Sequence, residues 1–337
     1  PAPYSQFYFK PFSANWLGEL RMIVANTIND LVGNTPILRL NRLFKKSSCS
    51  LFAKLEMQNP TSLKDRAVLG MVTDAIEAGK ILPGTEVVEA TSGNTGIALA
   101  ALAPALGFKA RLYMSELCSI ERQKIMAAFG AKVVLTPAAE HTRGARERAL
   151  DYIARNPSST YFLNQHSNPA NGDFHYKSTG PEIWEQLNGR VDAIVLGLGT
   201  CGTFEGTSKY LKEKNPDVKV FGVEPLASPV YSGGVAGAHH ITGIGPGFIT
   251  ENFKRGAERL DEIILVEDAK AFEWARKIAQ TEGILVGPSS GANLFAVDQI
   301  IHRPEFIGKR IACILCDTGE RYLSEEGFVD VSSIIKT

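Results

Sequence analysis

Short apolar runs rich in β-branched residues alternate with longer segments of helical periodicity over most of the chain. The short runs predict strands at residues 87–88, 110–113, 133–135, 193–196, 218–223 and 311–315. The longer segments predict helices at residues 95–106, 120–129, 143–154, 204–214 and 269–282. Such alternation is typical of an α/β fold with doubly wound, mainly parallel sheets, whose ligands bind at the carboxyl ends of the strands.

The length of 337 residues predicts two domains, because one domain takes about 150 residues. Hydrophobic residues at 44% and charged residues at 21% are typical of a soluble globular protein. No apolar run approaches the roughly 18 residues that cross a bilayer. The 36 basic and 36 acidic residues balance, and no run of like charge interrupts the chain. This composition argues against nucleic-acid and membrane partners.

The five cysteines are odd in number and scattered over the chain, which predicts reduced thiols in a cytosol-like compartment. The first twenty residues hold one lysine and six scattered aromatic residues but no apolar core segment. They therefore do not resemble a secretory signal. We expect residues 1–22 to form an N-terminal arm and the protein to be cytoplasmic.

Four glycine-rich turns mark candidate binding loops, at residues 91–96, 197–203, 243–247 and 287–291. Gly197, Gly199 and Gly202 have the G-x-G-x-x-G spacing between a predicted strand and a predicted helix, and Glu224 follows about 20 residues later. This spacing is compatible with a nicotinamide dinucleotide. It favours phosphate binding in general, since free amides and the dipole at a helix N-terminus attract any phosphate. A turn needed only for tight packing is the remaining alternative.

Three other motifs carry less weight. Ser289 lies in a G-x-S-x-G sequence between the strand-like segment 284–286 and a helix, but only His302 follows it, with Asp298 on the same predicted helix. That arrangement does not form a hydrolase triad. Cys313 and Cys316 lie in one apolar run and point to opposite faces of a strand, which favours core cysteines. The histidine pair at 239–240 is typical of a polar loop, and no zinc site is predicted.

Two further segments indicate chemistry. Residues 91–96 (Thr-Ser-Gly-Asn-Thr-Gly) place hydroxyls and an amide before a helix, where a carboxylate can bind, although an ordinary helix cap would have the same residues. Lys64 lies at the start of a helix predicted for 65–78. The positive end of the helix dipole disfavours an ammonium there. Schiff-base chemistry requires a neutral amine, so Lys64 is a candidate despite the default of a solvated surface lysine.

Together these segments resemble the fold-type II pyridoxal-phosphate enzymes, and most of all the cysteine synthases (O-acetylserine sulfhydrylases) within the cysteine synthase and cystathionine β-synthase family. The similarity runs in order from about residue 27 to residue 327. It rests on residues 34–36, 62–66, 91–96, 168–171, 179–184, 199–203, 222–225, 243–245 and 289–292.

The resemblance implies a tryptophan synthase β-like fold of two domains, with pyridoxal 5′-phosphate in the cleft between them. The larger domain would comprise residues 23–57 and 168–337, and the smaller, mobile domain residues 58–167. Lys64 would form the Schiff base, Asn94 would hydrogen-bond the 3′ oxygen of the cofactor, and Ser289 would face its ring nitrogen. The implied phosphate loop is Gly199, Thr200, Cys201, Gly202 and Thr203. The implied substrate-binding residues are Thr91, Ser92, Gly93, Thr95, Gln165 and Gly243.

The implied reaction is β-replacement on O-acetyl-L-serine by sulfide, which gives L-cysteine and acetate. A neutral hydroxyl opposite the ring nitrogen agrees with this, because it favours loss of a β-leaving group over full delocalisation of a carbanion. Lys64 would then also act as general base and acid. The resemblance implies a homodimer with an amino-acid substrate and a sulfide-type nucleophile, and it leaves open whether a serine acetyltransferase binds.

The chain departs from the family pattern at several positions. Cys201 replaces a glycine of the phosphate loop, and Pro246 and Pro288 replace small or aliphatic residues. Residues 140–144 also differ, and Arg143 there is suited to an anionic group on the substrate. O-phosphoserine sulfhydrylase, cystathionine β-synthase-like, cyanoalanine synthase and cysteine desulfhydrase activities therefore stay open. A nicotinamide-dependent oxidoreductase and a non-catalytic scaffold are the alternatives from other classes.

Overall fold

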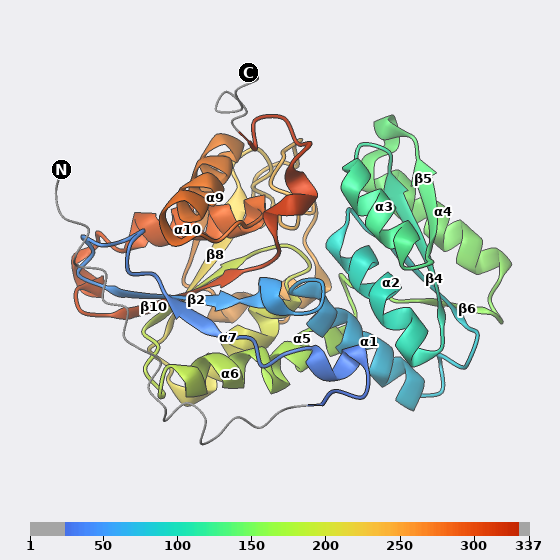
Figure 1. Cartoon of the computed structure of the whole chain (residues 1–337), viewed down its shortest axis with the longest axis horizontal. Coiled ribbons are helices and arrows are strands. Elements are labelled where there is room, and N and C mark those ends of the chain that lie inside the picture. The colour runs from blue at the N-terminus through green and yellow to red at the C-terminus, as the bar shows by residue number, and fades with distance from the viewer. Residues whose placement is uncertain (1–23, 330–337) are drawn as a thin grey trace.

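The computed structural model describes residues 24–329 and contains two β-sheets, side by side in Figure 1. The N-terminal arm expected at residues 1–22 lies outside the described residues. The larger sheet has six strands in the order β1-β2-β10-β7-β8-β9, and only β1 is antiparallel to its neighbour. Its strands are β1 (Ile37–Arg39), β2 (Ser50–Leu55), β7 (Ala193–Gly197), β8 (Lys219–Pro225), β9 (Glu262–Val266) and β10 (Arg310–Leu315).

The smaller sheet has four parallel strands in the order β5-β4-β3-β6. They are β3 (Glu86–Ala90), β4 (Lys109–Ser115), β5 (Lys132–Thr136) and β6 (Thr160–Phe162). The α-helices are α1 (Lys64–Glu77), α2 (Asn94–Leu106), α3 (Ile120–Ala128), α4 (His141–Arg155), α5 (Pro169–Lys177), α6 (Thr179–Gln186), α7 (Gly202–Lys214), α8 (Glu251–Lys254), α9 (Asp268–Glu282) and α10 (Pro288–Ile300). The 3-10 helices are η2 (Ile28–Leu31), η3 (Glu56–Gln58), η4 (Ala138–Glu140), η5 (Ala257–Arg259), η6 (Pro304–Phe306) and η7 (Gly319–Tyr322).

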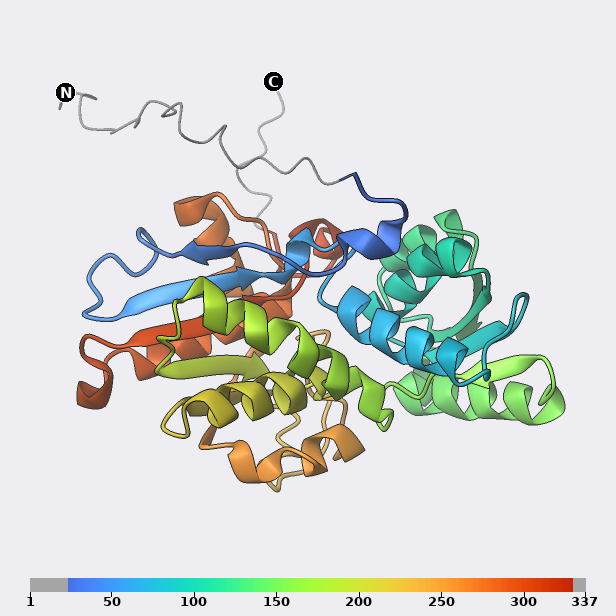
Figure 2. The same ribbon diagram turned by 90° about the horizontal axis from the view of Figure 1, so that it is seen from below.

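Helices cover both faces of the larger sheet, as the two views of Figures 1 and 2 show. Successive side chains of β10 point to opposite faces because the side-chain period of a strand is two. Ile311 and Cys313 pack with residues of α9 and α10, while Ala312 and Ile314 pack with residues of α6 and α7. A strand that is buried on both faces must be apolar throughout, which explains the unbroken apolar run in this part of the sequence.

The smaller sheet is covered in the same way. Val87 of β3 and Leu112 of β4 pack with α1, α2 and Met126 of α3. Val88, the next residue of β3, packs on the other face with Ala145 and Ala149 of α4. Each sheet is therefore the centre of its own core, and α1 joins the core of the smaller one.

The doubly wound, mainly parallel α/β fold predicted from the sequence is confirmed. The strand-like segment 284–286 is not a strand of either sheet. Only Val286 forms an isolated bridge, antiparallel to Thr318, and the segment leads from α9 into α10.

A buried group of charged side chains ties α1 to the larger sheet. Arg66 of α1 donates two hydrogen bonds to Glu56 (2.7 and 2.9 Å) and two to Glu182 of α6 (both 2.7 Å). Lys54 of β2 lies 2.6 Å from the same Glu182 carboxylate. Lys54, Glu56 and Arg66 have no exposed side-chain surface. These bonds fix the start of α1, two residues beyond Lys64, against β2 and α6.

Glu182 makes this group sensitive to acid. Burial acts to raise the pKa of this carboxyl, but the hydrogen bonds and charges of Arg66 and Lys54 prevail and lower its pKa to about 2. A carboxyl with a depressed folded-state pKa adds stability that is present above about pH 4.5 and is lost as the pH falls towards 2.

We expect Glu182→Gln to lower the free energy of unfolding by about 1.5–3 kcal/mol at neutral pH, the usual contribution of hydrogen bonds to charged groups. The deficit should shrink as the pH falls from about 4.5 towards 2, where the wild-type carboxyl is itself protonated. Denaturant unfolding of both proteins across this range measures it. A deficit that stays constant with pH would contradict the assignment.

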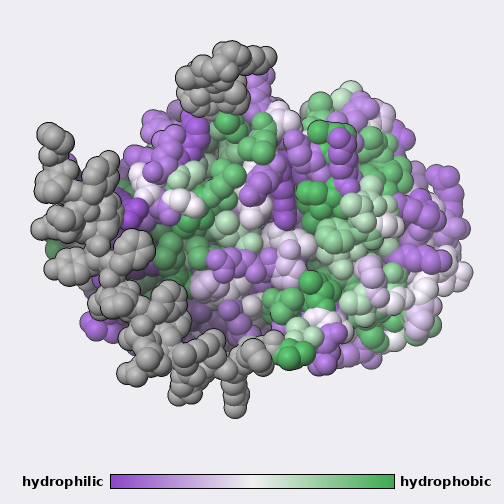
Figure 3. All heavy atoms as spheres, in the orientation of Figure 1, coloured by the Kyte–Doolittle hydropathy of each residue, from purple (hydrophilic) through white to green (hydrophobic). Residues whose placement is uncertain are grey.

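Hydrophobic and hydrophilic residues are interspersed on the face shown in Figure 3, and hydrophilic side chains are prominent at the rim formed by the smaller sheet and α4. Within residues 24–329, no helix combines the length and the apolar character that a membrane crossing needs.

Candidate active site

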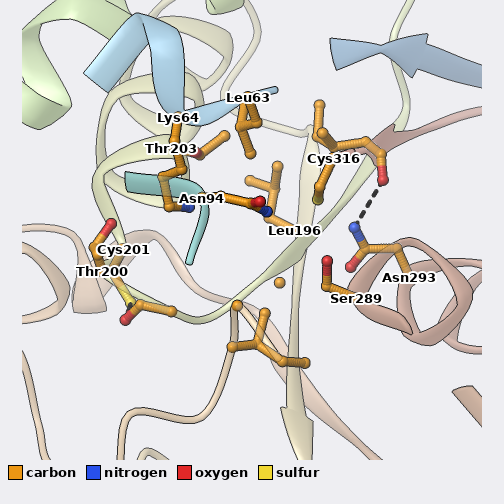
Figure 4. A pocket seen from close by; sticks show the side chains of 15 residues that line it. Leu63, Lys64, Asn94, Leu196, Thr200, Cys201, Thr203, Ser289, Asn293 and Cys316 are labelled. Atoms are coloured by element: carbon orange, nitrogen blue, oxygen red, sulfur yellow. Dashed lines mark hydrogen bonds between the residues drawn. The ribbon is translucent and has the colours of Figure 1, made fainter. Parts of the chain in front are cut away.

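A small pocket lies where the loops that follow the strands of both sheets meet, as expected for a parallel α/β fold. Lys64 of α1, Asn94 of α2 and Ser289 of α10 line it, together with the loop after β7 and Gly243. Figure 4 shows these side chains around one space, with the Asn293 amide nitrogen bonded to the Ile314 carbonyl at 2.8 Å. The pocket brings together residues from distant parts of the sequence, from Leu63 to Cys316.

The loop 198–203 leads from β7 into α7. The first helical amide with a backbone acceptor is that of Glu205, which donates to the Cys201 carbonyl at 2.8 Å. The amides of the first three helical residues, Gly202, Thr203 and Phe204, have no such intrahelical acceptor and are therefore free to bind an anion. A side chain at Gly199 would collide with the Gly243 carbonyl, and one at Gly202 with Asn171. Both glycines are thus required by the close packing of the loop.

Cys201 takes the left-handed backbone conformation (φ 63°, ψ 11°) just before α7. Glycine adopts this conformation without strain, while other residues lose roughly 1–2 kcal/mol, which explains why the family pattern has glycine here. The Cys201 thiol is 3% exposed and lies 3.4 Å from the Gly199 carbonyl. Burial raises its pKa to about 12, so this thiol is not a nucleophile at neutral pH.

Lys64 is the first residue of α1, as the sequence predicted. Two hydrogen bonds hold the backbone here: the Leu63 amide donates to the Cys316 carbonyl (2.9 Å) and the Lys64 amide to the Ser62 hydroxyl (3.3 Å). The side chain is half-buried and extends into the pocket. The loop after β10 therefore sets the position of the lysine backbone.

Ser289 is 3% exposed and lies in the first turn of α10. Pro288 occupies one of the first positions of the same helix, where its fixed φ favours helix initiation and no donor is lost. The proline that departs from the family pattern is therefore compatible with the helix. Figure 4 shows the Ser289 side chain directed into the pocket, across from Asn94.

The residues expected to bind a substrate carboxylate lie in and around the loop after β3. Ser92 is exposed and lines a larger cavity that adjoins the loop. Thr91, Thr95 and Gln165 are buried. The Thr95 hydroxyl donates to Gln165 (2.5 Å), and the Gly93 amide donates to the Thr91 hydroxyl (3.0 Å). Gly243, expected among the substrate residues, lines the smaller pocket beside the loop 198–203.

The larger cavity has a volume of about 1040 Å³ and opens between the two sheets. Its wall from α4 carries Arg143 and Arg146, and His166, Phe248 and Ser92 also line it. The Arg143 side chain is 88% exposed and lies 3.7 Å from Glu147. Arg143 thus stands at the rim of the cavity, paired with a solvent-exposed carboxylate.

Glu224 and His302 belong to the two other sites that the sequence motifs suggested, a dinucleotide-binding site and a hydrolase triad. The Glu224 carboxylate is fully buried and accepts hydrogen bonds from the Tyr231 and Ser232 amides (2.7 and 3.1 Å), so it is not available to a nucleotide ribose. His302 pairs with Asp298 at 3.6 Å on an exposed surface, and the hydrolase triad is correctly excluded.

All five cysteines are free, as predicted. Cys313 is a core residue, but Cys316 is only half-buried and lines the small pocket, because β10 ends at Leu315. The prediction of a core cysteine is therefore wrong for Cys316. Among the described residues, no cluster of three or more histidine, cysteine or acidic side chains could hold a metal ion.

Comparison with known proteins identifies the family. A profile described as "Pyridoxal-phosphate dependent enzyme" matches residues 28–317, which is most of the chain. The chain belongs to the pyridoxal-phosphate-dependent enzymes. It is 45% identical to a probable cysteine synthase of Bacillus subtilis, over 90% of this chain and 97% of that protein. It is 43% identical to cysteine synthase A of Escherichia coli K12, over 89% of this chain and 94% of that protein.

A solved structure is similarly close. The cysteine synthase of Entamoeba histolytica has a TM-score of 0.88 and 38% sequence identity, with 93% of each chain covered. The protein is thus a member of the cysteine synthase family, and its cofactor is pyridoxal phosphate.

The residues of the small pocket fit this cofactor. Free amides at the start of α7 and the hydroxyls of Thr200 and Thr203 suit a phosphate group. Lys64 offers an amine for a covalent link, and Ser289 offers a neutral hydroxyl. The nicotinamide alternative is excluded by the family.

Sequence reasoning missed three residues at this site, Arg122, Asp317 and Arg321. Asp317 and Arg321 both contact Asn94, and Arg122 donates to the Ser92 carbonyl at 2.9 Å. Asp317 and Arg321 follow directly after a strongly predicted strand, at the edge where ligands bind in parallel sheets. That position is the signal that could have found them.

Proposed function

We propose that this protein catalyses β-replacement on an O-activated L-serine, with O-acetyl-L-serine and sulfide as its substrates and L-cysteine and acetate as its products. The observation that carries the proposal is one pocket lined by a lysine at the start of a helix, a phosphate-type loop and a neutral serine. Membership of the cysteine synthase family supports the same reaction.

Separate residues of the chain bind the cofactor, transfer the proton and bind the substrate. The loop residues Gly199, Thr200, Cys201, Gly202 and Thr203 would hold the cofactor phosphate. Asn94 would donate to the 3′ oxygen of the cofactor, and Ser289 would face its ring nitrogen. Bound pyridoxal phosphate supplies an electron sink for negative charge at the substrate α-carbon. The Lys64 amine removes the α-proton and later returns a proton. Thr91, Ser92, Gly93, Thr95 and Gln165 bind the substrate carboxylate, and Gly243 borders the substrate.

A donor and nucleophile matrix tests the proposal. O-acetylserine, O-phosphoserine, serine and cysteine are each assayed with sulfide, cyanide and homocysteine, and the amino-acid products are identified. We expect the highest kcat/KM for O-acetylserine with sulfide. A higher value for another pair would assign the enzyme to a different β-replacement reaction, and no product from any pair would overturn the proposal.

O-phospho-L-serine is a second candidate donor because Arg143 and Arg146 line the larger cavity. Arg146 makes no ion pair within residues 24–329. A guanidinium binds a phosphate ester far better than a neutral acetyl ester.

If these arginines bind the phosphate of the donor, Arg143→Ala or Arg146→Ala should lower kcat/KM for O-phosphoserine by about 10- to 100-fold and leave O-acetylserine nearly unchanged. Steady-state kinetics with both donors decide this, with Arg148→Ala on the same helix as a control. Equal, small effects on the two donors would exclude the phosphate donor as the physiological one.

We also propose a cytoplasmic homodimer, with a larger domain of residues 23–57 and 168–337 and a smaller one of residues 58–167 that closes on the substrate. Five free cysteines suit a reducing compartment. Light scattering of the full chain measures the oligomeric state, with and without an added serine acetyltransferase.

A further inference from the structure

Asn94 has an amide whose orientation is set by two side chains from the other end of the sequence. Its Nδ2 donates to Asp317 Oδ2 at 2.6 Å, and its Oδ1 accepts from Arg321 Nη1 at 2.8 Å. A primary amide has one oxygen and two N–H donors. With the oxygen and one N–H engaged, only the second N–H remains for the pocket that Asn94 lines.

The Asp317 carboxylate accepts a second hydrogen bond besides the one from Asn94. It is fully buried, and the Tyr322 hydroxyl donates to the same Oδ2 at 2.5 Å. Its other oxygen, Oδ1, has no hydrogen-bond partner in the described structure. A buried carboxylate with an unpaired oxygen costs stability, and a role beyond structure explains why such a group stands at this position.

The segment 317–325 is in turn fastened to α3, on the side of the smaller sheet. The Ser119 hydroxyl donates to the Arg321 carbonyl (3.1 Å), and Arg122 pairs with Glu325 (3.0 Å). The Arg122 guanidinium also lies over the Tyr322 ring, 4.7 Å from its centroid. Asp317 and Arg321 are therefore fixed relative to α2 and α3, and not only to β10.

We propose that Asp317 and Arg321 are positioning residues that hold the Asn94 amide as a hydrogen-bond donor toward the cofactor. Without them the amide is free to rotate by 180° and to present its oxygen, which repels the electron-rich 3′ oxygen of pyridoxal phosphate. This inference rests on the proposed role of Asn94 within the proposed function.

The test is a double-mutant cycle on the full-length holoenzyme. Equilibrium dialysis measures the dissociation constant of pyridoxal phosphate for wild type, Asn94→Ala, Asp317→Ala and the double variant. Loss of one hydrogen bond to a charged oxygen should raise the constant by about 10- to 100-fold. If Asp317 acts through Asn94, Asp317→Ala should raise the constant by about as much as Asn94→Ala does, and the double variant should bind no more weakly than Asn94→Ala alone.

Tyr322→Phe is the matched control, because it removes the other hydrogen bond to Asp317 Oδ2 and leaves the Asn94 contact in place. It should keep the wild-type dissociation constant and the wild-type visible band of the bound cofactor. Asp317→Ala and Asn94→Ala should change that band in the same way. A change of equal size in Tyr322→Phe, or additive effects in the cycle, would overturn the inference.

Arg321→Met provides a second variant if Asp317→Ala has a lowered melting temperature. It removes the donor to Asn94 Oδ1, and its effect should likewise disappear in the Asn94→Ala background. Borohydride trapping of the cofactor on Lys64 in the wild-type protein reports separately on the proposed function. Trapping on Lys64 together with no effect of Asp317→Ala or Arg321→Met overturns this inference alone.

Discussion

We expect Lys64→Ala to abolish the visible absorption of the bound cofactor and to lower turnover by at least about 10²- to 10⁴-fold, the range for loss of a general base alone. The physical reason is that, in the proposed function, one amine serves as covalent attachment point and as proton carrier. Lys64 is the only lysine that lines the small pocket among the described residues. Absorbance spectra and initial rates with O-acetylserine and sulfide measure the effect.

The exposed Lys80, just beyond α1, is the matched control. Lys80→Ala should retain both the spectrum and the rate. Borohydride reduction of the wild-type holoenzyme, followed by peptide mapping, should place the cofactor label on Lys64. A label on any other lysine would refute the assignment.

We expect Arg66→Met to lower the free energy of unfolding by about 3–5 kcal/mol, the usual result of removing one partner from a buried ion pair. Glu56 would lose the one ion-pair partner that it has within residues 24–329 while fully buried, and Glu182 would keep only Lys54 there. Denaturant unfolding of the holoenzyme measures the change. The variant should also bind the cofactor less tightly, because Arg66 fixes the start of the helix that carries Lys64.

Arg143→Met is the comparison, since the exposed pair of Arg143 with Glu147 should contribute no more than about 1 kcal/mol. If Arg66→Met lowered the free energy of unfolding by less than about 1 kcal/mol, apolar packing alone could replace the buried ion pairs of Arg66. The proposed anchoring of α1 would then be wrong.

The local sequence was sufficient to predict most elements of this fold. Strand β10 and helix α9 lie within one residue of the predicted ranges, because an apolar run and an amphipathic period are local signals. The segment 284–286 only resembled a strand, because a short apolar run has the same pattern whether it forms a strand or a buried connection. Its place between α9 and α10 is visible only in the folded structure.

Some residues of the site could likewise be predicted from the local sequence, and others could not. Lys64, Asn94, Ser289 and the loop 199–203 could be proposed from the sequence because each lies in a short motif whose residue types indicate the chemistry, and the structure brings them to one pocket. Asp317 and Arg321 were not identified, because their importance comes from contacts with Asn94, more than 220 positions away in sequence. Their position after the strand β10 places them at the ligand-binding edge of the sheet, but only the folded structure shows the contacts with Asn94.

The sequence by itself determined the fold class, the order of the binding loops and the family, since periodicity and short motifs are properties of neighbouring residues. The tertiary structure decided which side chains can react and how the side chains of the site are held in place. Burial makes Cys201 inert, the Arg66 ion pairs anchor α1, and the Asp317 and Arg321 contacts orient Asn94. Desolvation, charge pairing and amide orientation all depend on which distant residues meet, and that is set only when the chain has folded.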